Sequence, residues 1–219
     1  ESLQNDQGFS FISSGEQQMI EVLTQIVDKA MKKGIDIKDI QVLAPMYRTQ
    51  AGINEINRHL QQLINPKTNK KREVKVNDVV FRVGDKVLQL VNQPEDGVYN
   101  GDIGEIVAIF KENENVENVE QIVVSFDDRE VVYEPQAYEN ITHAYCISIH
   151  KSQGSEFPIV ILPVVPGYRR MLRKNLLYTA ITRCKKSLIL CGNKQAFLQG
   201  VREEDTNLRN PSLTEKLVY

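Results

Sequence analysis

One polar loop and one arginine carry the residue types in this sequence that could do chemistry. The loop, Ser148 to Phe157, contains a base, an acid, a glycine and small hydroxyl side chains between two apolar runs. Arg183 ends a stretch in which apolar residues recur at four-residue spacing, as they do on one face of a helix. A guanidinium suits phosphate because its donors form a fixed fork. We therefore expect Arg183 to reach out of the fold toward a phosphate group.

Strands and helices of an α/β sheet must position these residues. Apolar runs from Ala144 to Ile149 and from Pro158 to Val165 flank the loop, and the strand-like run Ser187 to Cys191 follows Arg183. Loops at strand ends are where such folds bind ligands, because a rigid scaffold holds side chains that stay accessible. The pattern therefore predicts a ligand site at one edge of a sheet.

The first part of the chain reads as strand, helix, strand. Gly8 to Ile12 is a predicted strand, and Ser13 to Glu16 is a capping-box pattern that predicts a helix start. Gly34 is placed to terminate that helix in a left-handed conformation, and Ile40 to Ala44 is a second strand. This order predicts a parallel βαβ unit. The predicted apolar face of the helix consists of Met19, Ile20, Leu23, Ile26, Val27, Ala30 and Met31.

A second helix is predicted after Arg48, which lies in a strand-to-helix loop. Thr49 can cap this helix, and Asn65-Pro66 stops it. Its apolar face is expected to contain Ile53, Ile56, Leu60, Leu63 and Ile64.

From Val74 to about Gln136 the pattern changes to short β-type runs separated by glycine, asparagine and aspartate. Asp127-Asp128 is a predicted tight turn, and glycines near Asp85 and Asp102 predict bends of a small antiparallel barrel. The α/β pattern resumes afterwards, so the barrel reads as an insertion.

Two segments carry a resemblance to a known family, Ser148–Phe157 (SIHKSQGSEF) and Leu176–Arg183 (LLYTAITR). They resemble motifs V and VI of superfamily 1 helicases, specifically the RecD-like 5′→3′ DNA helicases. The resemblance covers about Val42 to Phe197. It implies a RecA-like parallel sheet with helices on both faces, interrupted by a small all-β SH3-like barrel. The implied domains are residues 1–73 with 137–202 (second RecA-like domain), 74–136 (insert) and 203–219 (tail).

The resemblance also assigns roles to residues. Arg183 looks like the catalytic motif VI arginine that reaches across a domain cleft to the γ-phosphate. Gly154 and Glu156 match positions beside the phosphates and ribose of a nucleotide, and Arg48 resembles the motif IV arginine that can approach the nucleotide. The motif V positions that lie nearer to single-stranded DNA are matched by Ser148, His150, Lys151 and Ser152.

A nucleotide-driven motor needs more than this sequence contains. No Gly-x-x-x-x-Gly-Lys-[Ser/Thr] occurs, and no apolar strand ends in Asp-Glu for magnesium. The sequence begins without methionine, so we expect a fragment whose ATP and Mg²⁺ are held mainly by an N-terminal RecA-like domain of the same parent chain. The resemblance implies single-stranded and fork DNA as partners. We expect this chain alone neither to hydrolyse ATP nor to unwind DNA.

The residue types also raise functions other than that of a helicase. A non-catalytic module that binds a protein partner or nucleic acid through the SH3-like insert remains the alternative. A Cys/His hydrolase is disfavoured, because Cys146 and His150 would lie about 13 Å apart along a strand. The four candidate metal ligands lack paired spacing and predict no metal site: Cys146, His150, Cys184 and Cys191.

Composition fits an ordinary globular protein, with 41% hydrophobic and 26% charged residues and a net charge of -2. Nucleic-acid binding must therefore depend on local basic patches. The three cysteines and the lack of a signal peptide or long apolar span favour a soluble cytoplasmic protein with free thiols and no membrane segment. Two basic clusters qualify as such patches, one of Lys67, Lys70, Lys71, Arg72 and Lys75, and one of Arg169, Arg170, Arg173, Lys174, Arg183, Lys185 and Lys186.

Overall fold

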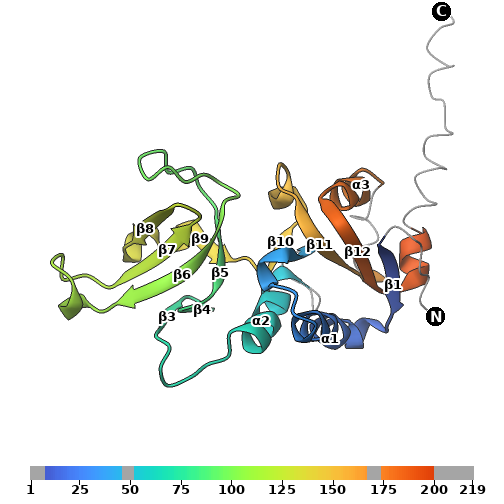
Figure 1. The fold of residues 1–219 in the computed structure, drawn as a ribbon, viewed down its shortest axis with the longest axis horizontal. Helices are drawn as coiled ribbons and strands as arrows, with labels where there is room; N and C mark the ends of the chain where they lie inside the picture. Colours follow the sequence, from blue (N-terminus) through green and yellow to red (C-terminus); the bar gives the residue numbers. More distant parts are fainter. Residues whose placement is uncertain (1–7, 46–51, 167–173, 200–219) are drawn as a thin grey trace, which may run out of the picture. The chain divides into compact units, whose positions relative to one another are not determined.

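The fold contains two compact units (Figure 1). The structure, a computed structural model, describes residues 8–45, 52–166 and 174–199. Unit 1 is made of Glu1–Ile53 and Ser148–Tyr219, and unit 2 is Asn54–Ile147. Both motif segments, Ser148–Phe157 and Leu176–Arg183, lie in unit 1 and within the described ranges. None of the helices in the described ranges has the length and apolar character needed to span a membrane.

Unit 1 is built around the strands β1, β12, β11 and β2 of a five-stranded sheet with the order β1-β12-β11-β2-β10, and the boundary between the units falls within β10. The strands β1, β12, β11 and β2 run parallel to one another. Every residue of β2 is buried, as expected for a strand inside a parallel sheet that is covered on both faces. The strand bounds are Phe9–Ser13 (β1), Ile40–Ala44 (β2), Cys146–Ser148 (β10), Phe157–Val164 (β11) and Cys184–Gly192 (β12).

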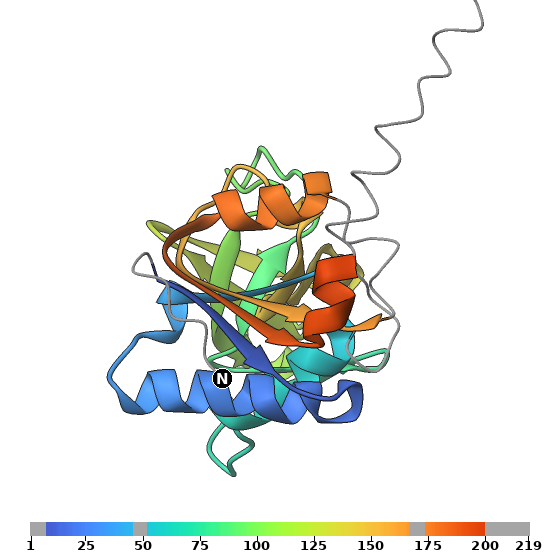
Figure 2. The same cartoon turned by 90° about the vertical axis from the view of Figure 1, so that its right-hand side faces the viewer.

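Helices lie on both faces of this sheet. α1 (Met19–Lys32) packs on one face of β11 and β12, and α3 (Lys174–Thr182) packs on the other face (Figure 2). α1 buries Met19, Leu23 and Val27 and is followed by Gly34, which has a φ of +83°. The predicted parallel sheet with helices on both faces is confirmed. The crossover from β1 to β2 passes β12 and β11, which enter the sheet between them.

The predicted capping box is wrong. The main chain continues β1 through a hydrogen bond from Ser14 N to Gly192 O (2.9 Å), and a 3₁₀ turn, η1 (Glu16–Gln18), precedes α1. Because this turn moves the helix start to Met19, Ser14 Oγ is buried without a hydrogen-bond partner. Neither η1 nor α1 has a side-chain cap.

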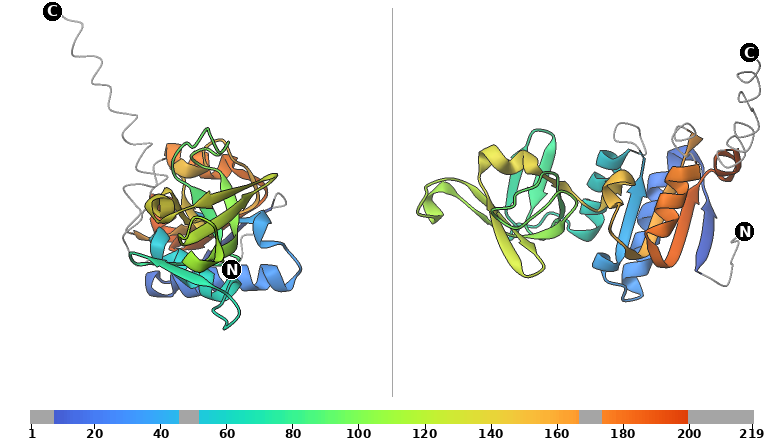
Figure 3. Two further views of the ribbon diagram at one scale, coloured as in Figure 1. Left: turned by 90° about the vertical axis from the view of Figure 1, so that its left-hand side faces the viewer. Right: turned by 90° about the horizontal axis from the view of Figure 1, so that it is seen from above.

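The β-rich part of unit 2 is an antiparallel sheet with the order β8-β7-β6-β5-β9, accompanied by the hairpin β3-β4 (Figure 3). This separate antiparallel sheet confirms the prediction of an SH3-like insert. The turn between β7 and β8 is formed by Asp127, which has a φ of +47°, and Asp128, as predicted. The strand bounds are Glu73–Val76 (β3), Val79–Arg82 (β4), Lys86–Gln89 (β5), Ile103–Phe110 (β6), Gln121–Phe126 (β7), Arg129–Tyr133 (β8) and Ile141–His143 (β9).

Three further 3₁₀ turns, besides η1, lie outside the motif loop. η2 (Ile37–Asp39) precedes β2, η3 (Glu112–Glu114) follows β6, and η4 (Pro135–Asn140) precedes β9. The segment 111–120 contains η3. It is tied by an ion pair between Lys111 and Glu120 (2.8 Å).

The helix α2 (Ile53–Ile64) has two buried faces. Its apolar residues Ile53, Ile56 and Leu60 are buried, as the sequence predicts. Asn57, Gln61 and Asn65, which follow one another at four-residue spacing, are buried as well. Asn57 pairs with the backbone of Cys146, accepting from its N–H (2.8 Å) and donating to its C=O (2.8 Å). Unit 2 therefore extends beyond the expected insert, residues 74–136, and includes most of this helix.

A fully buried carboxylate, Asp85, ties α2 to the strands of unit 2. Its Oδ2 accepts from Gln61 Nε2 (2.8 Å) and Arg82 N (2.8 Å) and lies 2.9 Å from His143 Nε2. Its Oδ1 accepts from Asn65 Nδ2 (2.8 Å) and Tyr145 OH (2.9 Å). Burial raises the pKa of Asp85, but the hydrogen bonds and charge of its partners, His143 foremost, outweigh burial, so the pKa is lowered. The carboxylate is thus stabilised as the anion.

Candidate functional site

The polar loop between β10 and β11 is held in place by its serines. It begins with a 3₁₀ turn, η5 (His150–Ser152). Ser148 Oγ accepts from Lys151 N (3.1 Å), and the hydroxyl of Ser152 donates to Ile149 O (2.6 Å). Both serines are buried, at 5% and 0% exposure. Short polar side chains that bond to nearby backbone fix such turns. In this fold Ser148 and Ser152 therefore position the loop.

The outer side of the same loop is accessible. His150, Gly154 and Glu156 are exposed, and Lys151 is half-buried. Gly154 has a φ of +84°, in the left-handed region that favours glycine. A methyl group built on Gly154 would meet nothing within 4 Å. Glycine is therefore required at this position by its backbone conformation, and the space beside it is open to a ligand.

Arg183 lies against this loop. It follows α3, and its carbonyl accepts from Phe157 N (2.8 Å), which fixes the helix end to the start of β11. Its Nη1 donates to Ser155 O (3.2 Å), and its Nη2 lies 3.5 Å from Thr182 Oγ1. Its Nε is buried and has no hydrogen-bond partner. Within the described parts of the chain, no carboxylate forms an ion pair with Arg183.

Glu156 has a partner that the sequence did not indicate. Its Oε2 lies 3.1 Å from Lys185 Nζ, with both side chains about half exposed (54% and 56%). Lys185 follows Arg183 by two residues, at the start of β12, and belongs to the basic stretch noted in the sequence. This pair lies at the surface, where an ion pair contributes little and can exchange partners.

The predicted site residues are thus only partly brought together. Arg183 and the loop that carries Gly154 and Glu156 meet at the same strand ends, and His150 and Lys151 belong to the same loop. Arg48 lies outside the described residues. The expected DNA contacts of Ser148 and Ser152 stay a prediction, and their burial favours an indirect role. Thr182 and Ser155, which hold the Arg183 guanidinium, are contributors that residue type alone did not single out.

The cysteines are poorly suited to nucleophilic chemistry. Cys146 and Cys191 are buried, and burial raises the pKa of the Cys191 thiol to about 12 and that of the Cys146 thiol further. The thiolate is the reactive form of cysteine, so both thiols are inert at neutral pH. His150, the base suggested for a hydrolase, is exposed on η5, whereas Cys146 is fully buried.

Known families match both parts of the chain. Residues 56–126 match the family described as the ATP-dependent RecD-like DNA helicase SH3 domain. Residues 143–191, which include the polar loop and Arg183, match the UvrD-like helicase C-terminal domain. Two separate parts of the chain are therefore similar to helicase domains, the second of them to a C-terminal domain.

Within that class, the SH3 match is specific to one branch, and curated relatives agree with it. The ATP-dependent RecD2 DNA helicase of Deinococcus radiodurans is 29% identical over 81% of this chain and 23% of that protein. The RecBCD enzyme subunit RecD of Buchnera aphidicola subsp. Schizaphis graminum is 27% identical over 75% of this chain and 26% of that protein. The chain is thus similar to RecD-like DNA helicases, and its residues 56–126 correspond to their SH3 domain.

The matches extend to other proteins and to a solved structure. A conjugal transfer protein TraA of Agrobacterium fabrum is 37% identical over 53% of this chain and 10% of that protein. A crystal structure of Pif1 helicase from Bacteroides in complex with ADP-AlF3 and ssDNA aligns with 93% of this chain and 55% of that chain, with a TM-score of 0.49 and 19% identity. The chain spans about a quarter of the length of the two RecD relatives.

Proposed function

We propose that this chain is the C-terminal motor half of an ATP-dependent 5′→3′ DNA helicase, which translocates on single-stranded DNA and unwinds duplex. The observation that carries the proposal is Arg183, whose guanidinium lies at a loop of exposed polar residues with a buried, unpartnered Nε and no described carboxylate. Arg183 is half-buried, and a guanidinium with one buried, unsatisfied N–H is suited to an anionic ligand that completes its hydrogen bonds.

In this proposal Arg183 is the catalytic residue that contacts the γ-phosphate of ATP. ATP with Mg²⁺ supplies the phosphoryl group whose transfer drives the motor. Gly154 leaves room for close backbone approach to the nucleotide, and Glu156 can accept from ribose hydroxyls if it exchanges its contact with Lys185. Arg48 is proposed to approach the same nucleotide from its strand-to-helix loop.

The phosphate-binding loop and the magnesium carboxylate are proposed to come from an N-terminal RecA-like domain of the same parent chain. No such phosphate-binding motif occurs in the 219 residues. We therefore propose that this chain alone does not turn over ATP. Residues 1–73 with 137–202 would form the second RecA-like domain of the motor, residues 74–136 its insert and 203–219 its tail.

Single-stranded DNA, including that of forks, is proposed to contact the outer side of η5. His150 and Lys151 lie there, and Ser148 and Ser152 hold the turn beneath them. Side chains of this kind contact phosphates and sugars and fix the register of a strand without reading its sequence. Because this turn and the residues near the nucleotide share one loop, closure on ATP would change the grip on DNA.

The test is ATP hydrolysis stimulated by single-stranded DNA, measured on the full-length parent protein. We expect Arg183→Ala to lower turnover by roughly 10³-fold or more, while binding of a labelled oligonucleotide persists. Arg129→Ala is the matched control, because Arg129 is an exposed arginine beside Asp128 in unit 2. Turnover that is unchanged in Arg183→Ala would refute the assignment, as would ATP turnover by the 219-residue chain alone.

A further inference from the structure

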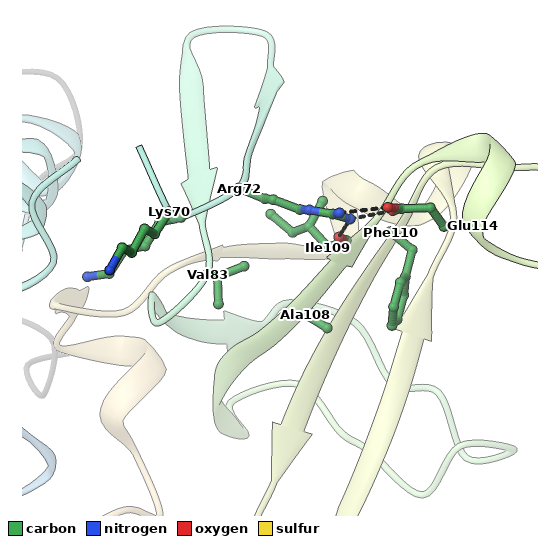
Figure 4. A pocket seen from close by; sticks show the side chains of 8 residues that line it. Lys70, Arg72, Val83, Ala108, Ile109, Phe110 and Glu114 are labelled. Atoms are coloured by element: carbon green, nitrogen blue, oxygen red, sulfur yellow. Dashed lines mark hydrogen bonds and ion pairs between the residues drawn. The ribbon is translucent and has the colours of Figure 1, made fainter. Parts of the chain in front are cut away.

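Unit 2 contains a pocket of about 400 Å³ that the motor function does not use. Basic residues line it at the segment before β3, and apolar residues of β6 line it on the other side. Figure 4 shows Lys70 at one end of the pocket and the Arg72–Glu114 pair with Phe110 at the other. The residues that matter here are Lys70, Arg72, Val83, Ala108, Phe110 and Glu114.

Arg72 already binds a carboxylate that a peptide loop presents. Both of its terminal nitrogens donate to Glu114, Nη2 to Oε1 at 2.6 Å and Nη1 to Oε2, and Nη1 also donates to Ile109 O (2.9 Å). This fork-to-fork pairing is the geometry in which arginine recognises carboxylates. The hydrogen bonds from Arg72 hold the pKa of Glu114 at about 2, so this carboxyl stays ionised. The pocket thus already contains one arginine–carboxylate contact, which is the kind of contact that an acidic ligand would make.

Lys70 leaves a second positive charge in the pocket. It is exposed and forms no ion pair with any carboxylate in the described part of the chain. The next residue, Lys71, instead donates to Asn65 Oδ1. A further anionic group can therefore be accepted at the Lys70 end without displacing Glu114 from Arg72.

The remaining wall is apolar and faces outward. Ile109 points into the core of unit 2, so Ala108 and Phe110 lie on the opposite face of β6. Ala108 is paired with Val123 of β7, and Val123 with Val132 of β8, which makes a row of apolar side chains across three strands. Phe110 and Val132 are 38% and 52% exposed. A pocket of this kind can pack an apolar side chain beside its charged groups.

We propose that this pocket docks an acidic segment of a partner protein, with a carboxylate at Lys70 and an apolar side chain against Ala108 and Phe110. This inference goes beyond the helicase function and does not depend on it. Charge complementarity and an apolar wall together recognise a peptide that mixes acidic and apolar residues.

The surroundings of the pocket favour a peptide over a nucleic acid. The segment that presents Glu114 also contains Glu112, Glu117 and Glu120. A nucleic-acid strand carries one negative charge on every nucleotide, so it would meet these carboxylates repeatedly. A short peptide can place one carboxylate at Lys70 and turn uncharged groups toward the acidic segment.

The experiment measures binding of two synthetic peptides to the 219-residue chain by fluorescence anisotropy. The probe is a fluorescein-labelled peptide of sequence Glu-Leu-Glu-Phe-Glu-Leu, and its twin has glutamine at each glutamate. We expect the glutamine twin to bind at least about tenfold more weakly, and Lys70→Glu to weaken binding of the acidic probe by about as much. Lys75→Glu is the matched control, because Lys75 is exposed, belongs to the same basic cluster and does not line the pocket. It should change binding less than about twofold.

A second variant tests the role of the carboxylate that is already bound. Glu114→Gln removes the charge that neutralises Arg72, so it should tighten binding of the acidic probe several-fold. Circular dichroism of each variant confirms folding. Equal binding of the two peptides, equal effects of Lys70→Glu and Lys75→Glu, or weaker binding in Glu114→Gln would overturn the proposal. A twelve-residue oligo-dT that binds more tightly than the acidic probe and loses affinity in Lys70→Glu would assign the pocket to nucleic acid instead.

Discussion

The buried charges of unit 2 and the arginine at the end of α3 in unit 1 have opposite surroundings. In unit 2, Arg82 is 3% exposed and pairs with Glu73 at 2.6 Å, and Asp85 is surrounded by five hydrogen-bonding groups. In unit 1, the partners of Arg183 among the described residues are a backbone carbonyl and a hydroxyl, and its buried Nε has none there. The charges of unit 2 are neutralised within that unit, whereas in the proposed function the charge of Arg183 is neutralised by a phosphate of the nucleotide.

The largest effect expected from this difference is on catalysis. Arg183→Lys keeps the charge but loses the planar fork, so it should lower ATP turnover of the parent protein almost as much as Arg183→Ala, by about 10²-fold or more. Thermal unfolding of the same variant should change little, since no ion pair is lost. A variant that destabilises the protein as much as it slows turnover would show that Arg183 is a structural residue.

Removing the buried charge of unit 2 should give the opposite result. Asp85→Asn leaves donors facing an amide in place of a carboxylate, and we expect it to lower the free energy of unfolding by about 3–5 kcal/mol. Urea unfolding followed by circular dichroism measures this, because the chain has no tryptophan. The control is Asp128→Asn, whose side chain is 78% exposed. Similar urea midpoints for the two variants would contradict the contrast between the units.

The same carboxylate predicts a pH dependence of stability. Its pKa in the folded protein is lowered below the usual value of about 3.9, so the unfolded chain takes up this proton first as the pH falls. The stabilisation is therefore complete above about pH 5 and is lost as the pH falls through 4 to the folded pKa. Urea unfolding between pH 7 and pH 3 should show a smaller loss in Asp85→Asn than in the wild type. Parallel curves for the two proteins would exclude Asp85 as a source of the pH dependence.

Gly154 and Gly192 of unit 1 differ in why the position favours glycine. At Gly154 the reason is the backbone conformation alone, and at Gly192 it is also the lack of space for a side chain. Gly154→Ala should cost about 1 kcal/mol, because its φ of +84° is strained for alanine but the space beside it is empty. Gly192→Ala should cost clearly more, since a built methyl carbon would lie 2.0 Å from Val164 O. Thermal unfolding midpoints of the two variants test the order. A larger loss in Gly154→Ala would mean that the loop is packed more tightly than the structure shows.

The smallest effect is expected at the surface pair of unit 1. Lys185→Ala should change the free energy of unfolding by less than about 1 kcal/mol, because both partners are half exposed. If Glu156 also contacts ribose in the parent protein, the variant should alter the KM for ATP more than it alters stability. A loss of stability comparable to that in Asp85→Asn would place this pair with the structural charges of unit 2.

Sequence periodicity predicted most of the fold. The apolar face of α1 and the strand β2 follow from the sequence because burial against the rest of unit 1 leaves a regular pattern of apolar residues. The start of α1 was misplaced, because a serine pattern cannot reveal that β1 continues through Ser13 and that a 3₁₀ turn follows. Ile181 lies four residues after Leu177 in the apolar pattern that precedes Arg183, yet it is 43% exposed.

Long-range polar contacts could not be predicted in the same way. Asn57, Gln61 and Asn65 look like the solvent face of an amphipathic helix, yet all three are buried. Their partners lie up to 89 residues away, as for Asn57 and Cys146. The candidate site was indicated by the types and order of its residues. The inward position of Ser148 and Ser152 depends on a turn that residue type does not specify.

The polar row on α2 has a consequence for exchanging unit 2 between related proteins. A graft that begins at Val74, where the β pattern starts, would separate Asp85 from Gln61 and Asn65. The buried carboxylate would then lack two of its hydrogen-bond donors. A transplantable cassette must instead include the helix from about Asn54 and continue to about Ile147, which also keeps the contact between Asn57 and Cys146. The boundaries of this cassette are therefore set by which residues are hydrogen-bonded to one another, and not by where the helix ends and the first strand begins.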